Sequence, residues 1–576
     1  MHIAIIGSGS AAFAAAIYAV EKGAKVTMIE AGIIGGTCVN VGCVPSKIFI
    51  RAAHVAHTQQ HHPFSGLSKP IPLLQKKLLL QQQQSRVDEL RHAKYESILA
   101  SNPNIVFMHG FASFNDANTL SVVTEQETCL IKADRVLIAT GSSPMIPAIP
   151  GLSDTPYWTS TEALQSETMP QHIAVLGGSI VAVELAQAFA RLGSQVTILA
   201  RSTLLSKEDP QIGAGLKEVF EEEGIKVVLN TIPQQVIHDG QHFMIKTGQG
   251  VIEADRLLVA TGRSANTQKL VLERSGVKTD SEGRILVDEQ MRTNVETIFA
   301  AGDCTNQPQY VYVAAAAGTR AAVNMLGGHA SLDLSIVPSV TFTDPQVATV
   351  GLTEAQAQEL KIEVESRSLP LSNVPRALVN FDTRGFVKLV AQKNTGRILG
   401  AQILAAEGGE VIQTMSIAIR KGMTINELSS QLFPYLTMVE SLKLCAQIFK
   451  KDVKKLSCCA DTFVMEEQSK AASPATGSNQ GSFVLPLWKT SSREQNSLLT
   501  IQPSVPNNLI IPGDSGQDCC NKKPTPETIQ SQSSWNKATV KYGMATTAAM
   551  GLFFIGYKIF NAGTLGVAHN LPKPSL

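Results

Sequence analysis

At 576 residues the chain is too long for one hydrophobic core, and about three or four domains are expected. The 49 lysine and arginine residues balance 48 aspartate and glutamate residues, and no basic block stands out, which excludes a nucleic-acid-binding surface. An apolar share of 44% fits a globular α/β protein. The 9 cysteines are too few for a disulfide scaffold, and no secretory signal precedes the first apolar run, so we expect a cytoplasmic protein with paired cysteines in redox or metal chemistry.

Two segments of the first half share one pattern. Residues 2–30 contain an apolar run, a glycine turn, an alanine-rich stretch and a second apolar run, which together predict a β-α-β unit. The pattern returns at residues 172–201, and DRVLIATGSS at 134–143 is repeated as DRLLVATGRS at 255–264. The first half is therefore predicted to be duplicated.

The first unit carries a glycine fingerprint at its turn. Gly7 suits the tight turn, Gly9 lets the backbone approach a pyrophosphate, and the small Ala12 lets helix and strand pack closely. Glu30 ends the second apolar run, where a carboxylate accepts ribose hydroxyls. This context predicts dinucleotide binding, with a plain turn as the alternative.

The second unit has the same offsets but ends differently. Gly177, Ser179 and Ala182 repeat the fingerprint, whereas Arg201 stands at the end of the second apolar run. A guanidinium pairs with a ribose 2′-phosphate, which a carboxylate would repel. The arginine favours NADPH over NADH; a solvated loop arginine is the alternative.

A cysteine pair follows the first unit, in GGTCVNVGCVPSK at residues 35–47. Cys38 and Cys43 stand at an expected helix start, where the helix dipole and Lys47 would favour both thiolates. A zinc half-site is the alternative, although no second Cys or His pair follows at suitable spacing.

This cysteine motif resembles the redox-disulfide signature of the FAD- and NAD(P)-dependent pyridine nucleotide-disulfide oxidoreductases. The resemblance extends to about residue 460 and implies that the first unit binds FAD, the second binds NADPH, and an α+β third domain forms a homodimer with shared active sites. The expected fold class is α/β, with two Rossmann-like domains and a dimerisation domain. The expected divisions are 1–150 and 266–335 (FAD), 151–265 (NADPH), 336–460 (dimerisation), 461–535 (disordered linker) and 536–576 (short apolar helix and tail).

The resemblance also implies roles for single residues. Asp303, in TIFAAGDC, matches the aspartate that hydrogen-bonds the ribityl chain of the flavin. Glu184 matches the glutamate that pairs with the signature lysine, here Lys47, beside the flavin ring. Further positions that match FAD contacts of the family are Gly32, Thr37, Lys47, Ala112 and Val311.

The position of the acid–base histidine separates branches of the family. Thiol-reducing relatives carry this histidine five positions before a glutamate, and alignment on Glu440 places Tyr435 there. A tyrosine with an ordinary pKa near 10 is a poor base for thiol–disulfide exchange. The tyrosine and the vicinal pair Cys458 and Cys459 resemble the branch that reduces mercuric ion, and Tyr95 resembles a tyrosine near the reducing site.

The resemblance therefore implies a flavoenzyme that takes Hg(II) as its substrate. NADPH would reduce FAD, Cys43 would lie nearer the flavin, Cys38 would be the outer, exchanging cysteine, and all four of Cys38, Cys43, Cys458 and Cys459 would bind the metal. Small-molecule thiols or a mercury importer would deliver it. The alternatives are a lipoamide dehydrogenase-like disulfide reductase, or a non-catalytic, membrane-tethered protein that binds soft metals through its vicinal cysteines, including Cys519 and Cys520.

Two further stretches, one polar and one apolar, are not assigned to a functional site. The group His57, His61 and His62 is expected to lie in a polar loop. Residues 542–557, YGMATTAAMGLFFIGY, are uncharged and would extend about 24 Å as a helix, short of the ~30 Å hydrocarbon core. We expect a helix that lies on a surface or packs in the dimer; a membrane anchor is the alternative.

Overall fold

The computed structural model describes residues 1–455, all of which lie in one compact unit. The vicinal pairs Cys458–Cys459 and Cys519–Cys520, the linker and the apolar segment 542–557 lie outside the described residues. Within residues 1–455, none of the helices has the length and apolar character that crossing a membrane requires.

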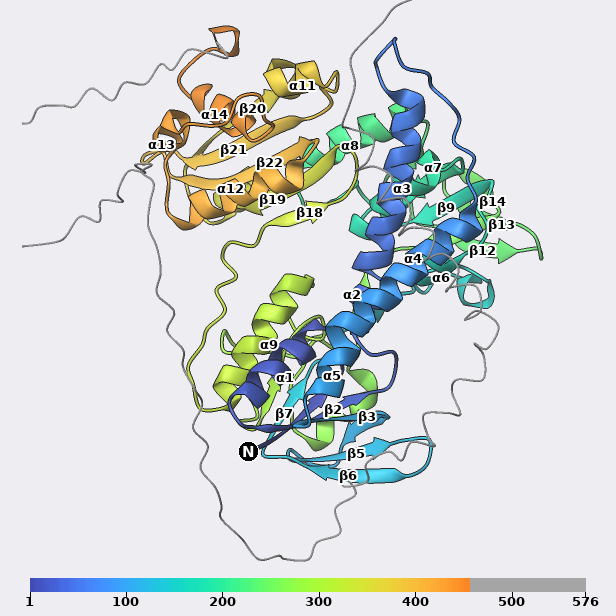
Figure 1. The fold of residues 1–576 in the computed structure, drawn as a ribbon. Coiled ribbons are helices and arrows are strands. Elements are labelled where there is room, and N and C mark those ends of the chain that lie inside the picture. Colours follow the sequence, from blue (N-terminus) through green and yellow to red (C-terminus); the bar gives the residue numbers. More distant parts are fainter. Residues whose placement is uncertain (456–576) are drawn as a thin grey trace, which may run out of the picture. The chain divides into compact units, whose positions relative to one another are not determined.

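The first sheet is parallel, and its strands come from segments that precede and follow the second β-α-β unit in the chain. Its order is β17-β7-β1-β2-β3, with β1 (His2–Ile6), β2 (Lys25–Glu30), β3 (Ile105–His109), β7 (Arg135–Ile138) and β17 (Ile298–Ala300). The strand β17 returns to pair with β7, so the chain leaves this sheet, builds the next domain and comes back. Strands β4 (Phe111–Phe114), β5 (Thr119–Val123) and β6 (Thr128–Lys132) form an antiparallel sheet beside it (Figure 1).

Two alanine-rich helices cover this sheet and pack closely together. They are α1 (Ser10–Glu21) and α9 (Val311–Met325), which lie side by side in Figure 1. A Cβ on Gly318 of α9 would lie 2.1 Å from the carbonyl oxygen of Ala11. Only glycine therefore permits this approach of the two backbones.

The second sheet repeats the first in the order β11-β10-β9-β15. It is parallel and contains β9 (His172–Leu176), β10 (Gln195–Leu199), β11 (Lys226–Val228) and β15 (Arg256–Val259), with β12 (Gln235–His238), β13 (Phe243–Thr247) and β14 (Gly250–Ala254) as an antiparallel sheet. The two connections between the domains pair as β8 (Ser142–Pro144) and β16 (Arg263–Ala265). The associated helices are α6 (Ser160–Gln165), α7 (Ile180–Arg191) and α8 (Pro210–Glu222).

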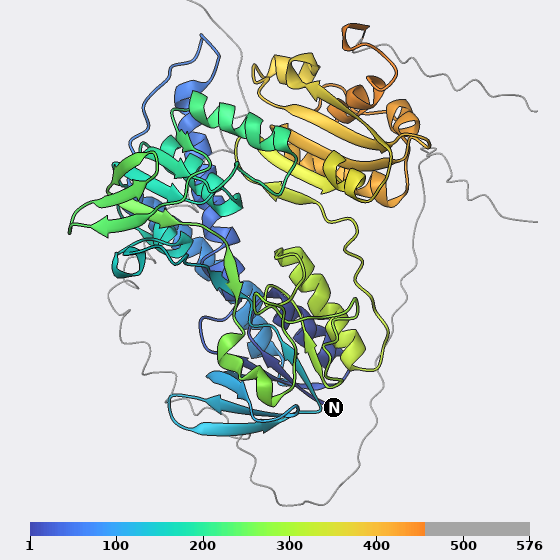
Figure 2. The ribbon, with the colours of Figure 1, turned by 180° about the vertical axis from the view of Figure 1, so that it is seen from behind.

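The third sheet is antiparallel, in the order β18-β19-β22-β21-β20. Its strands are β18 (Ser339–Thr341), β19 (Gln346–Gly351), β20 (Val364–Pro370), β21 (Phe386–Gln392) and β22 (Ile398–Ala405). Its helices are α10 (Glu354–Glu359), α11 (Pro375–Val379), α12 (Gly408–Arg420), α13 (Ile425–Ser430) and α14 (Glu440–Gln447). Seen from behind, α8 runs beside this sheet (Figure 2), and Gly215 of α8 faces Leu404 of β22.

Four helical segments lie between β2 and β3 of the first sheet. They are α2 (Gly36–Asn40), α3 (Cys43–His61), α4 (Lys76–Arg91) and α5 (Ser97–Ser101), with a π-helical turn at His92–Glu96. The helix α3 packs against α7, so it reaches from the first dinucleotide unit to the second (Figure 1). It also contains His57 and His61, which were expected in a loop; their rings stack 4.2 Å apart on successive turns.

Candidate functional site

The two fingerprint turns have nearly the same geometry. Gly7 has φ +111° and Gly177 has φ +133°, and a Cβ at either position would lie 2.2 Å from a backbone oxygen, that of Ala139 or that of Ala260. Glycine is therefore required at both turns. Each turn leads directly into a helix of 12 residues, α1 or α7, whose N-terminal amides suit a phosphate group.

The first turn has open space where a dinucleotide would approach. No atom lies within 4 Å of the position that a Cβ on Gly9 would take, and Ala12 is fully buried beneath the turn. The Glu30 carboxylate at the end of β2 accepts hydrogen bonds from the Ser8 hydroxyl and the Gly32 amide, both at 2.7 Å. These residues fit the adenosine half of FAD.

The remaining positions that resemble FAD contacts lie on several elements. Asp303 follows β17, and its Oδ2 accepts a hydrogen bond at 3.0 Å from the Ser142 hydroxyl, which in turn accepts one at 2.7 Å from Arg263 Nε. Sequence reasoning missed Ser142 and Arg263, because their link to Asp303 depends on the pairing of β8 with β16. Thr37 is exposed on α2, Val311 begins α9, and Ala112 is buried on β4.

The second fingerprint has a cationic rather than an acidic end. Ser179 is the N-cap residue of α7, and Ala182 is fully buried in its first turn. Arg201 is exposed just beyond β10. Its guanidinium is therefore accessible from solvent, as a contact with a ribose phosphate requires.

The cysteine pair lies at the junction of α2 and α3. Cys38 belongs to α2 and is partly buried, whereas Cys43 is the first residue of α3 and is exposed; both thiols are free. The hydrogen bond from the Cys38 thiol, opposed by burial and assisted by the charge of Lys47, lowers the pKa of Cys43 to about 7. Donating that hydrogen bond raises the pKa of Cys38. The sequence-based expectation favoured both thiolates, whereas the structure favours one, on Cys43.

Lys47 lies one turn after Cys43 on α3 and pairs with Glu184 of α7. Its Nζ is 2.7 Å from Glu184 Oε2, and Glu184 is buried with a side chain 4% exposed. The pairing that the resemblance implied is therefore present. It joins the helix of the redox cysteines to the helix of the second fingerprint.

Tyr95 packs beside the cysteine segment. Its ring meets that of Phe13 edge to face at a centroid distance of 4.8 Å, and a Cβ on Gly35 would lie 3.2 Å from its Cδ2. Burial and the neighbouring cysteines raise the pKa of its hydroxyl, against a hydrogen bond with Ser10. The neutral phenol is thus favoured at neutral pH.

Tyr435 lies in the third domain, on the segment between α13 and α14, and is 58% exposed. Glu440, five positions later, begins α14 and is buried, and burial raises its pKa. Its Oε2 has no hydrogen-bond partner among residues 1–455. The cysteines Cys129, Cys304 and Cys445 are buried, and the last two belong to apolar core clusters.

Comparison with known proteins places this geometry in a family. The model of the pyridine nucleotide-disulphide oxidoreductases matches residues 1–318, and the model of their dimerisation domain matches residues 337–446. Mercuric reductase of Shigella flexneri is 60% identical over 467 residues, covering 80% of this chain and 83% of the relative. Mercuric reductase of Streptomyces lividans is 48% identical over 465 residues, covering 80% and 98%.

Solved structures of more distant relatives share the fold. The Cu(II) complex of the HOCl-induced flavoprotein disulfide reductase RclA from Escherichia coli has a TM-score of 0.71 at 30% identity, covering 78% of this chain and 99% of that chain. LpdA from Mycobacterium tuberculosis has a TM-score of 0.70 at 28% identity, covering 78% and 100%. The paired fingerprints, the cysteine motif and these matches confirm the expected fold class, and the chain belongs to the pyridine nucleotide-disulphide oxidoreductase family.

Proposed function

We propose that this protein is an oxidoreductase that reduces Hg(II) to Hg(0) with NADPH as the electron donor. The observation that carries the proposal is 60% identity over 467 residues with a mercuric reductase, in a chain that retains the Cys38–Cys43 motif and has tyrosine at position 435. The overall reaction transfers two electrons, because NADPH and Hg(II) give NADP⁺, a proton and Hg(0). Bound FAD would accept the hydride from NADPH and pass the two electrons on.

The residues around the first fingerprint fit FAD as a resident cofactor. Gly7 and Gly9 would let the pyrophosphate approach the N-terminus of α1, and Glu30 would accept the ribose hydroxyls. Asp303, oriented by Ser142, would hold the ribityl chain, with Gly32, Thr37, Ala112 and Val311 lining the remainder of the site.

The residues around the second fingerprint fit NADPH. Gly177, Ser179 and Ala182 would receive the pyrophosphate at the start of α7, and Arg201 would pair with the 2′-phosphate. Lys47 and Glu184 lie where α3 and α7 meet, and the two cofactors would approach each other there.

The cysteine pair supplies the soft ligands that a thiophilic cation prefers. The Cys43 thiol has a pKa of about 7, so a large fraction is thiolate at neutral pH, and Cys38 can lose its proton when the metal arrives. Two thiolates five positions apart would hold Hg(II) beside the flavin while it accepts electrons. Tyr95, packed against the same segment, would bound the metal site as a neutral phenol.

The residues that would deliver Hg(II) come from the last part of the third domain and from the segment that follows it in the sequence. The match to the dimerisation domain supports a homodimer. We propose that Tyr435 and the pair Cys458 and Cys459 belong to the site of the opposite subunit, and that this pair takes Hg(II) from small-molecule thiols or from an importer. We further propose a cytoplasmic location, where such thiols are abundant; fractionation of the full chain against one ending at Ala460 tests any membrane contact of the tail.

The acceptor test separates the proposed function from its alternatives. Purified holoprotein is given NADPH with Hg(II) and excess thiol, and in parallel with oxidised lipoamide, glutathione disulfide or Cu(II). We expect NADPH oxidation that depends on Hg(II) and is slow with both disulfides. Fast lipoamide reduction without mercury-dependent oxidation would favour a disulfide reductase, and no oxidation with any acceptor would favour a metal-binding protein without turnover.

A further inference from the structure

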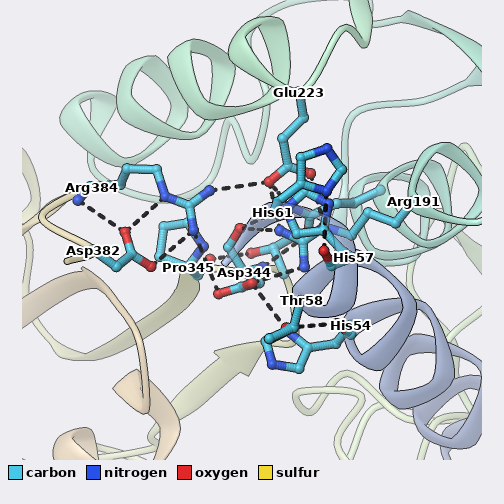
Figure 3. A network of polar contacts seen from close by, with 12 residues as sticks. His54, His57, Thr58, His61, Arg191, Glu223, Asp344, Pro345, Asp382 and Arg384 are labelled. Atoms are coloured by element: carbon cyan, nitrogen blue, oxygen red, sulfur yellow. Dashed lines mark hydrogen bonds and ion pairs between the residues drawn. The ribbon is translucent and has the colours of Figure 1, made fainter. Parts of the chain in front are cut away.

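Three residues of the third domain run between the helix of the redox cysteines and the helix of the second fingerprint. We call residues 342–344 the strap; they connect β18 (Ser339–Thr341) with β19 (Gln346–Gly351). Their polar contacts with α3 and α7 are drawn in part in Figure 3.

The strap is bound along one face of α7. The Phe342 amide donates to Glu184 Oε1 at 2.8 Å, and the side-chain amide of Gln187 exchanges two hydrogen bonds of 2.8 Å with the backbone of Asp344. Arg191 Nη1 then donates to Asp344 Oδ2 at 2.8 Å. Because Glu184, Gln187 and Arg191 recur at intervals of three and four residues, they form one stripe on the helix.

The same strap is bound along one face of α3. His54 Nδ1 donates to Asp344 Oδ2 at 3.1 Å, and Lys47 Nζ lies 4.7 Å from the centre of the Phe342 ring. His54 lies seven residues after Lys47, which places both side chains on the same face two turns apart. The strap therefore contacts α3 through Phe342 and Asp344, and the same two residues contact α7.

The contacts of the strap with α3 and α7 form a clamp, whose far end, at Asp344, is held by buried ion pairs. Arg191 has a side chain 4% exposed and also forms a two-pronged ion pair with Glu223, with donor–acceptor distances of 2.6 and 2.8 Å. Arg384 reaches Glu223 at 3.1 Å and is itself held by Asp382 (Figure 3). Although burial opposes ionisation of Asp344, the hydrogen bond from His54 and the charge of Arg191 lower the pKa of its carboxyl well below the usual range. Such charge-assisted contacts are the stronger ones in proteins.

The near end of the clamp is the ion pair beside the cysteines. Lys47 is one turn from Cys43 and forms an ion pair with Glu184, the residue that also binds the strap. A shift of the strap would therefore move both the ring against which Lys47 rests and the carboxylate with which it pairs.

We propose that the strap is a positioning device, in which Asp344, held by His54 and Arg191, fixes Lys47 beside the redox-active cysteines. Asp344 and His54 are positioning residues, since neither is in the fingerprint turns or the cysteine motif. The strap belongs to the third domain, so the same contacts make the reducing site dependent on how that domain packs against α3 and α7. The inference concerns the cysteine pair and holds whatever its final electron acceptor.

The expected consequence is a change in the balance between disulfide and dithiol. Lys47 stabilises the reduced pair because a nearby cation favours the thiolate, and a stabilised reduced form makes a disulfide easier to reduce. Loss of the clamp through Asp344→Asn should move the equilibrium toward the disulfide by at least about threefold. His54→Gln should act in the same direction with a smaller effect, because the Arg191 contact remains.

The test equilibrates holoprotein with glutathione redox buffers and measures the fraction of Cys38 and Cys43 that is alkylated. Asp382→Asn is the matched control, because it removes a carboxylate from the same network at a position that contacts neither helix nor the strap; we expect it to leave the equilibrium unchanged. Combining Asp344→Asn with Lys47→Met provides a double-mutant cycle, and we expect Asp344→Asn to have no further effect once Lys47 is removed.

Each outcome of this test decides the proposal. An equilibrium within twofold of wild type in Asp344→Asn would overturn it, as would an equal shift in Asp382→Asn. The same shift with and without Lys47 would also overturn it, because the strap would then not act through that lysine. If Asp344→Asn does not fold, His54→Gln, whose side chain is 38% exposed in the native protein, takes its place in the cycle.

Discussion

The helices α1 and α7 begin at equivalent turns and have the same length, yet they bury different faces. Every buried residue of α1 is apolar, and its alanines pack against α9. The helix α7 buries Glu184, Gln187 and Arg191 among its apolar residues. The repeat thus gives both units the same backbone, whereas the side chains on the helix face decide whether the helix also ties domains together.

The positions that differ are equivalent in the repeat. Ala14, Ile17 and Glu21 of α1 stand where α7 has the three polar residues, and all three are at least partly exposed. The polar stripe of α7 is costly to bury unless each group finds a partner, and here the strap and Glu223 provide them. The redox helix α3 is thereby joined to α7 rather than to α1.

The largest effect is expected where α3 begins, because that end carries the chemistry. Cys43→Ser should reduce mercury-dependent NADPH oxidation by at least about 10³-fold, since serine supplies neither the thiolate ligand nor the electrons. FAD content and the unfolding temperature should stay at wild-type values, as the turn at Gly7 and the α1 packing are untouched. Stopped-flow turnover and flavin absorbance check both; loss of FAD in this variant would assign Cys43 a structural role.

The donor preference distinguishes the ends of the two units. Arg201→Glu places a carboxylate where the first unit has its own acidic residue, Glu30. The ratio of kcat/KM for NADPH to that for NADH should fall by about 10- to 100-fold, as expected for the loss of a charge-assisted phosphate contact. Arg256→Glu, on β15 of the same domain, is the charge-matched control; an unchanged ratio in Arg201→Glu would show that another residue recognises the phosphate.

The close packing of α1 can be broken without touching α7. Gly318→Ala would place a Cβ 2.1 Å from the Ala11 oxygen, and the required shift should cost about 1–3 kcal/mol of unfolding free energy and weaken FAD retention. Gly66→Ala is the matched control, because no atom lies within 4 Å of its Cβ position. Differential scanning calorimetry of both variants should show a lower melting temperature for Gly318→Ala alone; equal melting temperatures would contradict the packing argument.

The polar face of α7 should respond to acid, whereas the apolar face of α1 should not. The pKa of Asp344 is lowered in the folded protein, so its contribution is complete above the unfolded pKa of about 3.9 and is lost as the pH falls toward the folded value. Asp344→Asn should therefore cost about 1–3 kcal/mol at pH 7, and the difference from wild type should shrink between about pH 5 and pH 3. Urea unfolding across this range measures it; a constant difference would mean that Asp344 is not ionised through its clamp.

Much of the fold follows from patterns that the sequence states locally. The β-α-β units, the glycines at positions 7 and 177 and the cysteine motif each occupy a short segment, and the structure has the expected elements there. The Lys47–Glu184 pair joins residues far apart in sequence, and only the family resemblance pointed to it. The vicinal pair at Cys458 and Cys459 stays a prediction, since it lies outside the described residues.

The remainder of the site depends on tertiary contacts that the sequence does not state. His57 and His61 were expected in a loop but lie in α3, because the mixed polar and apolar residues of this helix give no clear helical repeat. Asp344 occupies a connection between two strands and acquires its role only when α3 and α7 both reach it. One signal was available: three polar residues at helical spacing in the apolar stretch 180–191 indicate a buried partner.

The central claim is two-electron reduction of Hg(II), and its most direct test is the elemental mercury released. Holoprotein with limiting NADPH, excess thiol and Hg(II) is sealed under a carrier gas, and mercury vapour is trapped and quantified. We predict one Hg(0) for each NADPH consumed, with no vapour from the Cys43→Ser variant. NADPH consumption without mercury vapour, with the electrons recovered as reduced thiol or hydrogen peroxide, would contradict the account.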